Sequence, residues 1–187
     1  IGLFARLGSA LAPVSNWIAG SGPSRWFLDR FLGIDRRRTL PRFVAQPFSK
    51  WFGKRVSTSE AQKGQVVLYN DTFAEYEEPQ IAMAATVLLE RAGYEVVLVE
   101  NKVCCGRPMI SKGFLEQARD NARQNIEALL PYAEKGIPII GIEPSCILTL
   151  RDDYRDLVPG QGSQRLADSV YMLEEFLALR ARAGDLD

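Results

Sequence analysis

Three short apolar runs, separated by stretches of helical periodicity, restrict the fold of residues 66–187. The runs span residues 66–69, 94–99 and 137–142, and most of their residues are β-branched or aromatic, as in strands. Residues 79–92, 111–133 and 163–182 instead place apolar side chains three or four positions apart, as amphipathic helices do. This order predicts an α/β domain of the βαβαβα type, in which helices cover both faces of a small parallel sheet in three layers.

The three cysteines of the chain follow the second and third apolar runs. Cys104 and Cys105 are adjacent in a loop that continues into Gly106, and Cys146 comes shortly after the third run. The first run also ends in a polar stretch, which includes Thr72. In a parallel sheet, ligands bind at the edge where the carboxyl ends of the strands meet. We therefore expect the three thiols to lie together at that edge, where a cofactor would bind.

The composition excludes several kinds of site and environment. With 47% hydrophobic and 25% charged residues the sequence is that of an ordinary globular chain, and its apolar runs are too short to span a membrane. The absence of histidine excludes Ser-His-Asp triads, Cys-His nucleophilic pairs and histidine metal sites. Three cysteines, two of them adjacent, do not suit a secreted disulfide framework. We expect reduced thiols or metal ligands in a cytoplasmic protein.

The thiols allow three interpretations. Adjacent thiols point in different directions, so Cys104 and Cys105 can bind different irons of an iron-sulfur cluster, with Cys146 as a further ligand. Gly106 would allow a close backbone approach and Arg107 would supply positive charge. Alternatively, the start of a helix would lower the pKa of Cys146 and make it a thiol-redox site. The third interpretation is that all three are inert thiols of the core.

Residues 1–55 differ from the rest of the chain in charge and in pattern. They contain ten lysines and arginines against two aspartates, whereas residues 56–187 contain thirteen against twenty-one acidic residues. Prolines and glycines break this segment into short, aromatic-rich helices. We predict a basic helical connector at 1–55, a linker at 56–65 and the α/β domain at 66–187. The connector would bind an acidic neighbour, a partner subunit or the inner face of an anionic membrane; no nucleic-acid motif is present.

Residues 103–108, 143–146 and 150–154 together resemble the cysteine-rich CCG domain family, and the resemblance covers about residues 66–158. This family occurs in heterodisulfide reductase, in iron-sulfur subunits of glycolate oxidase and anaerobic glycerol-3-phosphate dehydrogenase, and in fused FAD-linked oxidases. The resemblance implies the first of two repeats and a 4Fe-4S cluster held by Cys104, Cys105 and Cys146. Thr72 and Thr149, however, stand where the family carries cysteines.

The family resemblance implies an electron-transfer domain. It would pass electrons from a flavin, which oxidises a 2-hydroxy acid or glycerol 3-phosphate, towards a quinone-like acceptor, with FAD bound only by a partner domain or subunit. Since two expected ligands are threonines, the alternatives are a cluster shared with the second repeat, or a cluster-free repeat that serves as a scaffold or docking domain. A dinucleotide-binding domain is disfavoured, because no G-x-G-x-x-G follows the first run.

Overall fold

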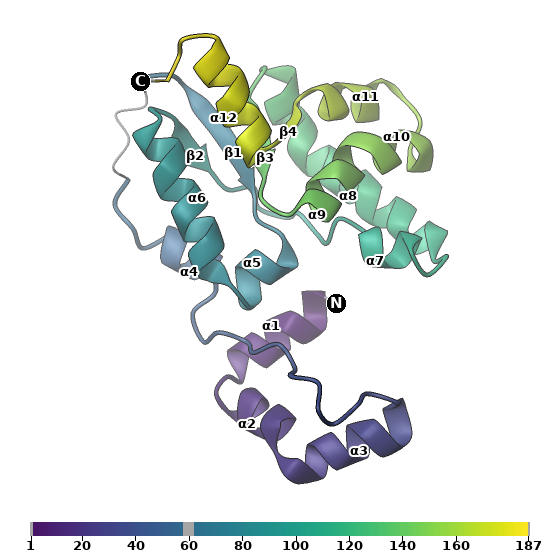
Figure 1. Ribbon diagram of the computed structural model, residues 1–187. Coiled ribbons are helices and arrows are strands. Elements are labelled where there is room, and N and C mark those ends of the chain that lie inside the picture. Colours follow the sequence, from purple (N-terminus) through teal and green to yellow (C-terminus); the bar gives the residue numbers. More distant parts are fainter. Residues whose placement is uncertain (1, 58–61, 187) are drawn as a thin grey trace.

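The fold is built around a four-stranded parallel sheet. The computed structural model describes residues 2–57 and 62–186. The strands are β1 (Gln65–Tyr69), β2 (Glu95–Val97), β3 (Ile139–Gly141) and β4 (Val170–Met172), in the order β2-β1-β3-β4 (Figure 1). Val66 pairs with Val96, and Leu68 pairs with Ile140. The predicted parallel α/β sheet is confirmed, with one strand more than the sequence indicated.

Helices cover both faces of the sheet, which gives the three predicted layers (Figure 1). Val66 and Leu68 point to one face and Val67 and Tyr69 to the other, as alternation along a strand requires. The first face is covered by α4 (Phe48–Phe52), α5 (Thr72–Tyr76), α6 (Pro79–Arg91) and α12 (Leu173–Arg182). The second is covered by α8 (Leu115–Glu134), α9 (Pro144–Leu148), α10 (Tyr154–Leu157) and α11 (Gln161–Asp168).

The predicted helix over residues 163–182 is wrong, because strand β4 interrupts it. Leu166 and Val170 are buried with α8 on one face of the sheet, whereas Phe176 is buried with α6 on the other. A single straight helix cannot reach both faces. The chain therefore crosses the sheet edge as a short strand, in which Val170 pairs with Ile139. The helical spacing of the apolar residues concealed this crossing, because it continues across the break.

Two further boundaries differ from the prediction. The long helix begins at Leu115 rather than near residue 111, because Gly113 adopts a positive φ of 78° that ends the preceding turn. A short helix, α7 (Arg107–Ile110), follows the thiol pair instead. After Cys146, α9 passes into a π-helical turn at Thr149–Asp153, a distortion that is frequent at functional sites.

The N-terminal segment forms the short helices that its sequence predicts. These are α1 (Gly2–Ala10), α2 (Val14–Gly20) and α3 (Gly22–Leu32), which lie apart from the sheet in Figure 1. The segment is attached where α1 contacts α5 and where the Val44 N–H donates to the Tyr76 carbonyl at 2.9 Å. Helix α4 belongs with the sheet, since Phe48 is completely buried in its core. Part of the predicted linker, residues 58–61, lies outside the described residues.

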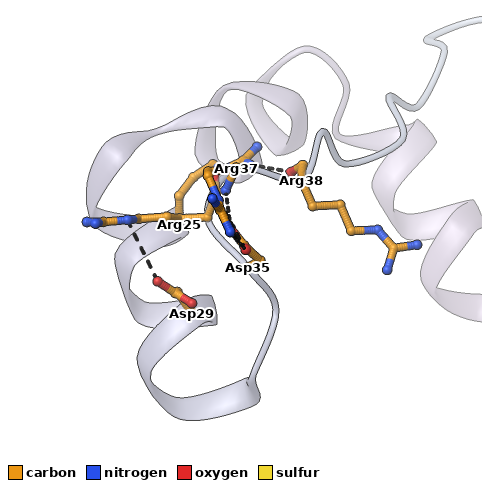
Figure 2. A network of polar contacts seen from close by, with 6 residues as sticks. Arg25, Asp29, Asp35, Arg37 and Arg38 are labelled. Atoms are coloured by element: carbon orange, nitrogen blue, oxygen red, sulfur yellow. Dashed lines mark hydrogen bonds and ion pairs between the residues drawn. The ribbon is translucent and has the colours of Figure 1, made fainter.

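The arginine-rich turn after α3 is held by exposed polar contacts (Figure 2). Arg25 donates hydrogen bonds to the carbonyls of Arg36 and Arg38, and Arg37 pairs with Asp35 at 2.7 Å. Around it, α1 to α3 expose large apolar side chains, of which Trp17 is 75% exposed. None of the helices in the described part of the chain has both the length and the apolar character needed to cross a bilayer.

Candidate functional site

All three thiols lie on one groove at the carboxyl ends of β1 and β2. The groove has a volume of about 980 Å³, and Cys104, Cys105, Cys146 and Thr72 all line it. Its walls come from the segments that follow β1 and β2, from α9 and from the N-terminal segment. The structure thus places together four of the six site residues that the sequence predicts; Gly106 and Arg107 lie just outside the lining.

The middle thiol of the three, that of Cys105, interacts with the other two. Cys105 is 2% exposed and interacts with both Cys104 and Cys146, while Cys104 is half-buried. The backbone N–H groups of Gly106 and Arg107 interact with the sulfurs of Cys104 and Cys105 respectively. Three thiols, two of which also interact with backbone N–H groups, therefore lie at the groove.

The environment holds the adjacent thiols in their neutral form. The interaction with Cys105, followed by burial, raises the pKa of Cys104 well above its usual range. The pKa of Cys105 rises to about 12: the interaction with Cys104 lowers it, but the interaction with Cys146 and burial together outweigh that effect. A metal centre would therefore have to displace protons from these thiols when it binds, as thiolate ligation generally requires.

The raised thiol pKa values predict that the apo domain loses stability in alkaline solution. The unfolded chain releases a cysteine proton at about pH 8.5, whereas folded Cys105 holds its proton up to about pH 12. The cysteine contribution to the free energy of unfolding should therefore be constant below about pH 8 and fall from about pH 8.5 to 12, by up to 1.4 kcal/mol per pH unit for each such thiol. Urea unfolding of the reduced protein measures this slope. Cys105→Ala should reduce it by more than half, because the interaction with Cys105 is also the largest cause of the raised pKa of Cys104; an unchanged slope in this variant would contradict the assignment.

A buried polar cluster adjoins the thiols, and the sequence did not identify it as part of the site. The Lys102 ammonium donates to the carbonyl of Asn70 at 2.6 Å and lies 5.1 Å from the centre of the Tyr69 ring. Burial lowers the pKa of Lys102. The Asn70 amide group donates to Glu75, while its Oδ1 is buried without a partner among the described residues. A lysine two residues before the thiol pair, in the loop that follows an apolar run, was the available signal.

Gly106 and Arg107 affect the conformation of the thiol loop: Gly106 allows its turn, and Arg107 links it to Asp153. Gly106 has a φ of 91° where the chain enters α7, and this left-handed conformation favours glycine. The Arg107 guanidinium turns towards the π-helical turn and pairs with Asp153 at 3.3 Å, with 47% of its side chain exposed. Its positive charge is therefore partly neutralised and screened by solvent.

The two threonines at expected cysteine positions have different surroundings. Thr72 lines the groove at the start of α5, next to Asp71, whose carboxylate caps that helix. Thr149 is 1% exposed, and its hydroxyl donates to the carbonyl of Ser145 at 2.8 Å. Only Thr72 is therefore placed at the groove with the thiols.

The donor set suits a sulfur-ligated cluster better than a single ion. Across residues 2–57 and 62–186, no three histidine, cysteine, aspartate or glutamate side chains are grouped as ligands of one metal ion. A single zinc ion needs its ligands within about 2.3 Å of one point. A cluster spreads its irons over several thiolates, and Cys104, Cys105 and Cys146, which line one groove, are thiols of the kind that such a cluster takes as ligands.

Comparison with known proteins places this site in a family. The cysteine-rich CCG domain matches residues 68–151. A subunit of anaerobic glycerol-3-phosphate dehydrogenase from Escherichia coli is 34% identical over 83% of this chain and 40% of its own length. A subunit of fumarate reductase (CoM/CoB) from Methanothermobacter marburgensis is 31% identical over 79% of this chain and 29% of its own length.

A third relative, D-2-hydroxyglutarate dehydrogenase of Escherichia coli, is 29% identical over 65% of this chain and 12% of its own length. The chain thus spans less than half of each of these relatives. Among solved structures, none matches the chain significantly. The matched segment contains Thr72 and all three cysteines of the groove. Residues 68–151 therefore form a cysteine-rich domain of the CCG family, homologous to the corresponding parts of these dehydrogenase and reductase proteins.

Proposed function

We propose that this chain is an iron-sulfur electron-transfer domain of an FAD-linked dehydrogenase. Cys104, Cys105 and Cys146 would hold a cluster of the 4Fe-4S type, which supplies one-electron transfer when it is bound. The observation that carries this proposal is that all three thiols line one groove of a CCG domain. The chain's own contribution is to supply sulfur ligands, to bury them and to direct amide N–H groups at them.

Reconstitution of the reduced protein tests this proposal. The purified chain is incubated anaerobically with ferrous iron and sulfide and then desalted. We expect bound iron and acid-labile sulfide in similar amounts, with a visible absorption band that bleaches on reduction. A colourless protein that retains neither iron nor sulfide would contradict the proposal and favour a cluster-free scaffold.

Thr72, which stands where the family carries a further cysteine, allows a prediction about how firmly iron is held. Thr72→Cys adds a fourth thiol at the groove, so the variant should release iron to a chelator at least about tenfold more slowly, since even indirect changes around metal ligands alter affinity by about 10–100-fold. Thr149→Cys is the matched control, because that side chain is buried within the helix turn and should give no gain. If both variants retained iron equally, a position at the groove would not determine which residues act as ligands.

The partners are part of the same proposal. The relatives are named as a dehydrogenase, a dehydrogenase subunit and a reductase subunit, and the chain spans only part of each. We propose that a flavoprotein domain or subunit oxidises a 2-hydroxy acid or glycerol 3-phosphate at FAD and passes electrons singly to this domain. A second CCG repeat would lie beside it, and a quinone-like molecule would accept the electrons.

The N-terminal segment supports a location at the inner face of the cytoplasmic membrane. Helices α1 to α3 expose Trp17, Trp26 and Phe27, and the arginines of residues 25–38 lie on the same segment. Aromatic and basic side chains together favour an anionic lipid surface. Cosedimentation with vesicles that contain anionic lipid, compared with neutral vesicles, tests this contact; equal binding to both would exclude an electrostatic contribution.

A cluster-free docking domain is the second candidate. It is favoured by the threonines at two expected ligand positions, one of which, Thr149, is hydrogen-bonded within its helix. If a Cys104→Ser, Cys105→Ser variant keeps full activity in the assembled complex, the docking role is correct and the cysteines are relics. A thiol-redox role for Cys146 predicts instead that alkylation of this residue alone abolishes activity.

A further inference from the structure

Side chains from three other elements donate hydrogen bonds to the loop that carries the adjacent thiols. The carbonyls of Val103, Cys104 and Cys105 each accept a side-chain hydrogen bond of 3.0 Å. The donors are Tyr69 in β1, Asn121 in α8 and Tyr154 at the start of α10. Three successive backbone carbonyls of this loop are thus each fixed by a side chain.

Asn125 joins these contacts into one network. Its Oδ1 accepts from the Val103 N–H at 2.8 Å, and its Nδ2 donates to the carbonyl of Cys104 at 3.3 Å and to the Tyr154 hydroxyl at 2.8 Å. The Tyr154 hydroxyl in turn donates to the carbonyl of Cys105. Both Asn125 and Tyr154 are completely buried. The polar groups of these two side chains therefore bond to one another and to the backbone of the thiol loop.

Packing alone does not require polar groups at these positions. Asn125 lies on the buried face of α8 between Ala122 and Leu129, and Tyr154 lies in the same apolar cluster. Their polar groups instead bond to the loop backbone, where the Val103 N–H and the Cys105 carbonyl would otherwise be left unsatisfied. What the polar pair adds is a defined backbone orientation, since fully satisfied buried networks specify one conformation.

The fixed carbonyls determine where the thiols and amides point. With each carbonyl of residues 103–105 held by its side-chain donor, Cys104 and Cys105 line the groove. The backbone N–H groups of Gly106 and Arg107 interact with those two thiols. Hydrogen bonds to cluster sulfurs are among the features that set reduction potential.

We infer that Asn125 and Tyr154 are positioning residues, which hold the backbone of residues 103–105 so that both thiols line the groove. This inference deepens the proposed function and rests on it for the identity of the bound centre. Neither residue touches the centre itself. Their effect is exerted through the carbonyls of Cys104 and Cys105.

The first test uses the reduced protein without metal. Tyr154→Phe removes only the hydroxyl, so the variant should fold, but the carbonyl of Cys105 loses its donor. The hydroxyl also accepts from Asn125, so two hydrogen bonds are lost. Since each is worth about 1 kcal/mol, local opening and the rate at which iodoacetamide modifies Cys105 should increase by at least about fivefold. Peptide mass spectrometry measures this rate separately for each cysteine. Tyr171→Phe is the matched control, because its hydroxyl contacts only the backbone of Asp168 on the surface, and it should leave the rate unchanged.

The second test uses the reconstituted protein. Tyr154→Phe and Asn125→Leu should lower the midpoint potential, because a loosened loop weakens the N–H interactions that stabilise the reduced centre, while Tyr171→Phe should not. An unchanged potential together with an unchanged Cys105 rate would overturn the inference. So would equal acceleration at Cys105 and Cys146 with a lowered melting temperature, since that indicates a purely structural role. If the wild-type protein takes up no iron, the proposed function fails, and the alkylation rates still decide the positioning role.

Discussion

Replacing Cys104 and Cys105 together by serine should reduce bound iron and sulfide to the background of the assay. A hydroxyl is a hard, weakly acidic donor that does not replace thiolate at an iron-sulfur centre. Because these residues supply two of the three thiols at the groove, we expect a loss of more than about tenfold in retained iron after desalting. Iron and sulfide assays after anaerobic reconstitution measure it.

Two controls show whether the double variant has lost iron ligands or has lost its fold. Ser145→Ala alters the residue next to Cys146 but removes only an exposed contact to Glu143, so it should retain iron normally. Circular dichroism of each variant shows whether the sheet and helices persist. A folded double variant that keeps iron and colour would exclude the adjacent thiols as ligands.

Replacing Glu90 by alanine should destabilise the domain by about 3–5 kcal/mol, the usual cost of removing one partner of a buried ion pair. Glu90 lies on α6 and is 2% exposed at its side chain, where it accepts from Arg55 at 2.5 Å. The Arg55 guanidinium lies 4.0 Å from the centre of the Phe52 ring, so it cannot turn freely to solvent. The variant leaves a buried cation without its carboxylate, and urea unfolding measures the loss.

An exposed ion pair on the same molecule is the matched control. Glu116 pairs with Arg119 at the same 2.5 Å separation, but its side chain is 78% exposed. Glu116→Ala should therefore change the free energy of unfolding by less than about 1 kcal/mol. Similar losses in the two variants would show that burial does not control the strength of the Arg55–Glu90 pair.

The sequence predicted the parts of the fold that depend on local patterns. Short apolar runs identified strands β1 to β3, and the position of each cysteine after a run indicated one shared edge of the sheet. The crossing at Val170 was not predictable from spacing, because Leu166 and Leu177 continue the same helical period on opposite faces of the sheet. Pairing with β3, a contact distant in sequence, determines that segment.

In the candidate site, too, some residues were identifiable from the sequence and others were not. Cys104, Cys105 and Cys146 were identifiable because their residue type carries the chemistry. Asn125 was missed, although a polar residue on the buried face of an amphipathic helix signals a buried partner. Its partners, the Val103 N–H and the Cys104 carbonyl in a loop about twenty residues earlier, could be named only from the folded chain.

The complete burial of Phe48 determines where a gene fragment encoding this domain can begin. This aromatic ring precedes β1 by more than a dozen residues, yet it fills the same core as Leu68 and Leu89. A fragment that begins at residue 66 would lose the ring, a deletion that typically costs about 3–5 kcal/mol of the 5–15 kcal/mol that stabilise a whole domain. The shortest fragment expected to express in folded form therefore retains the peptide from Pro47 onward.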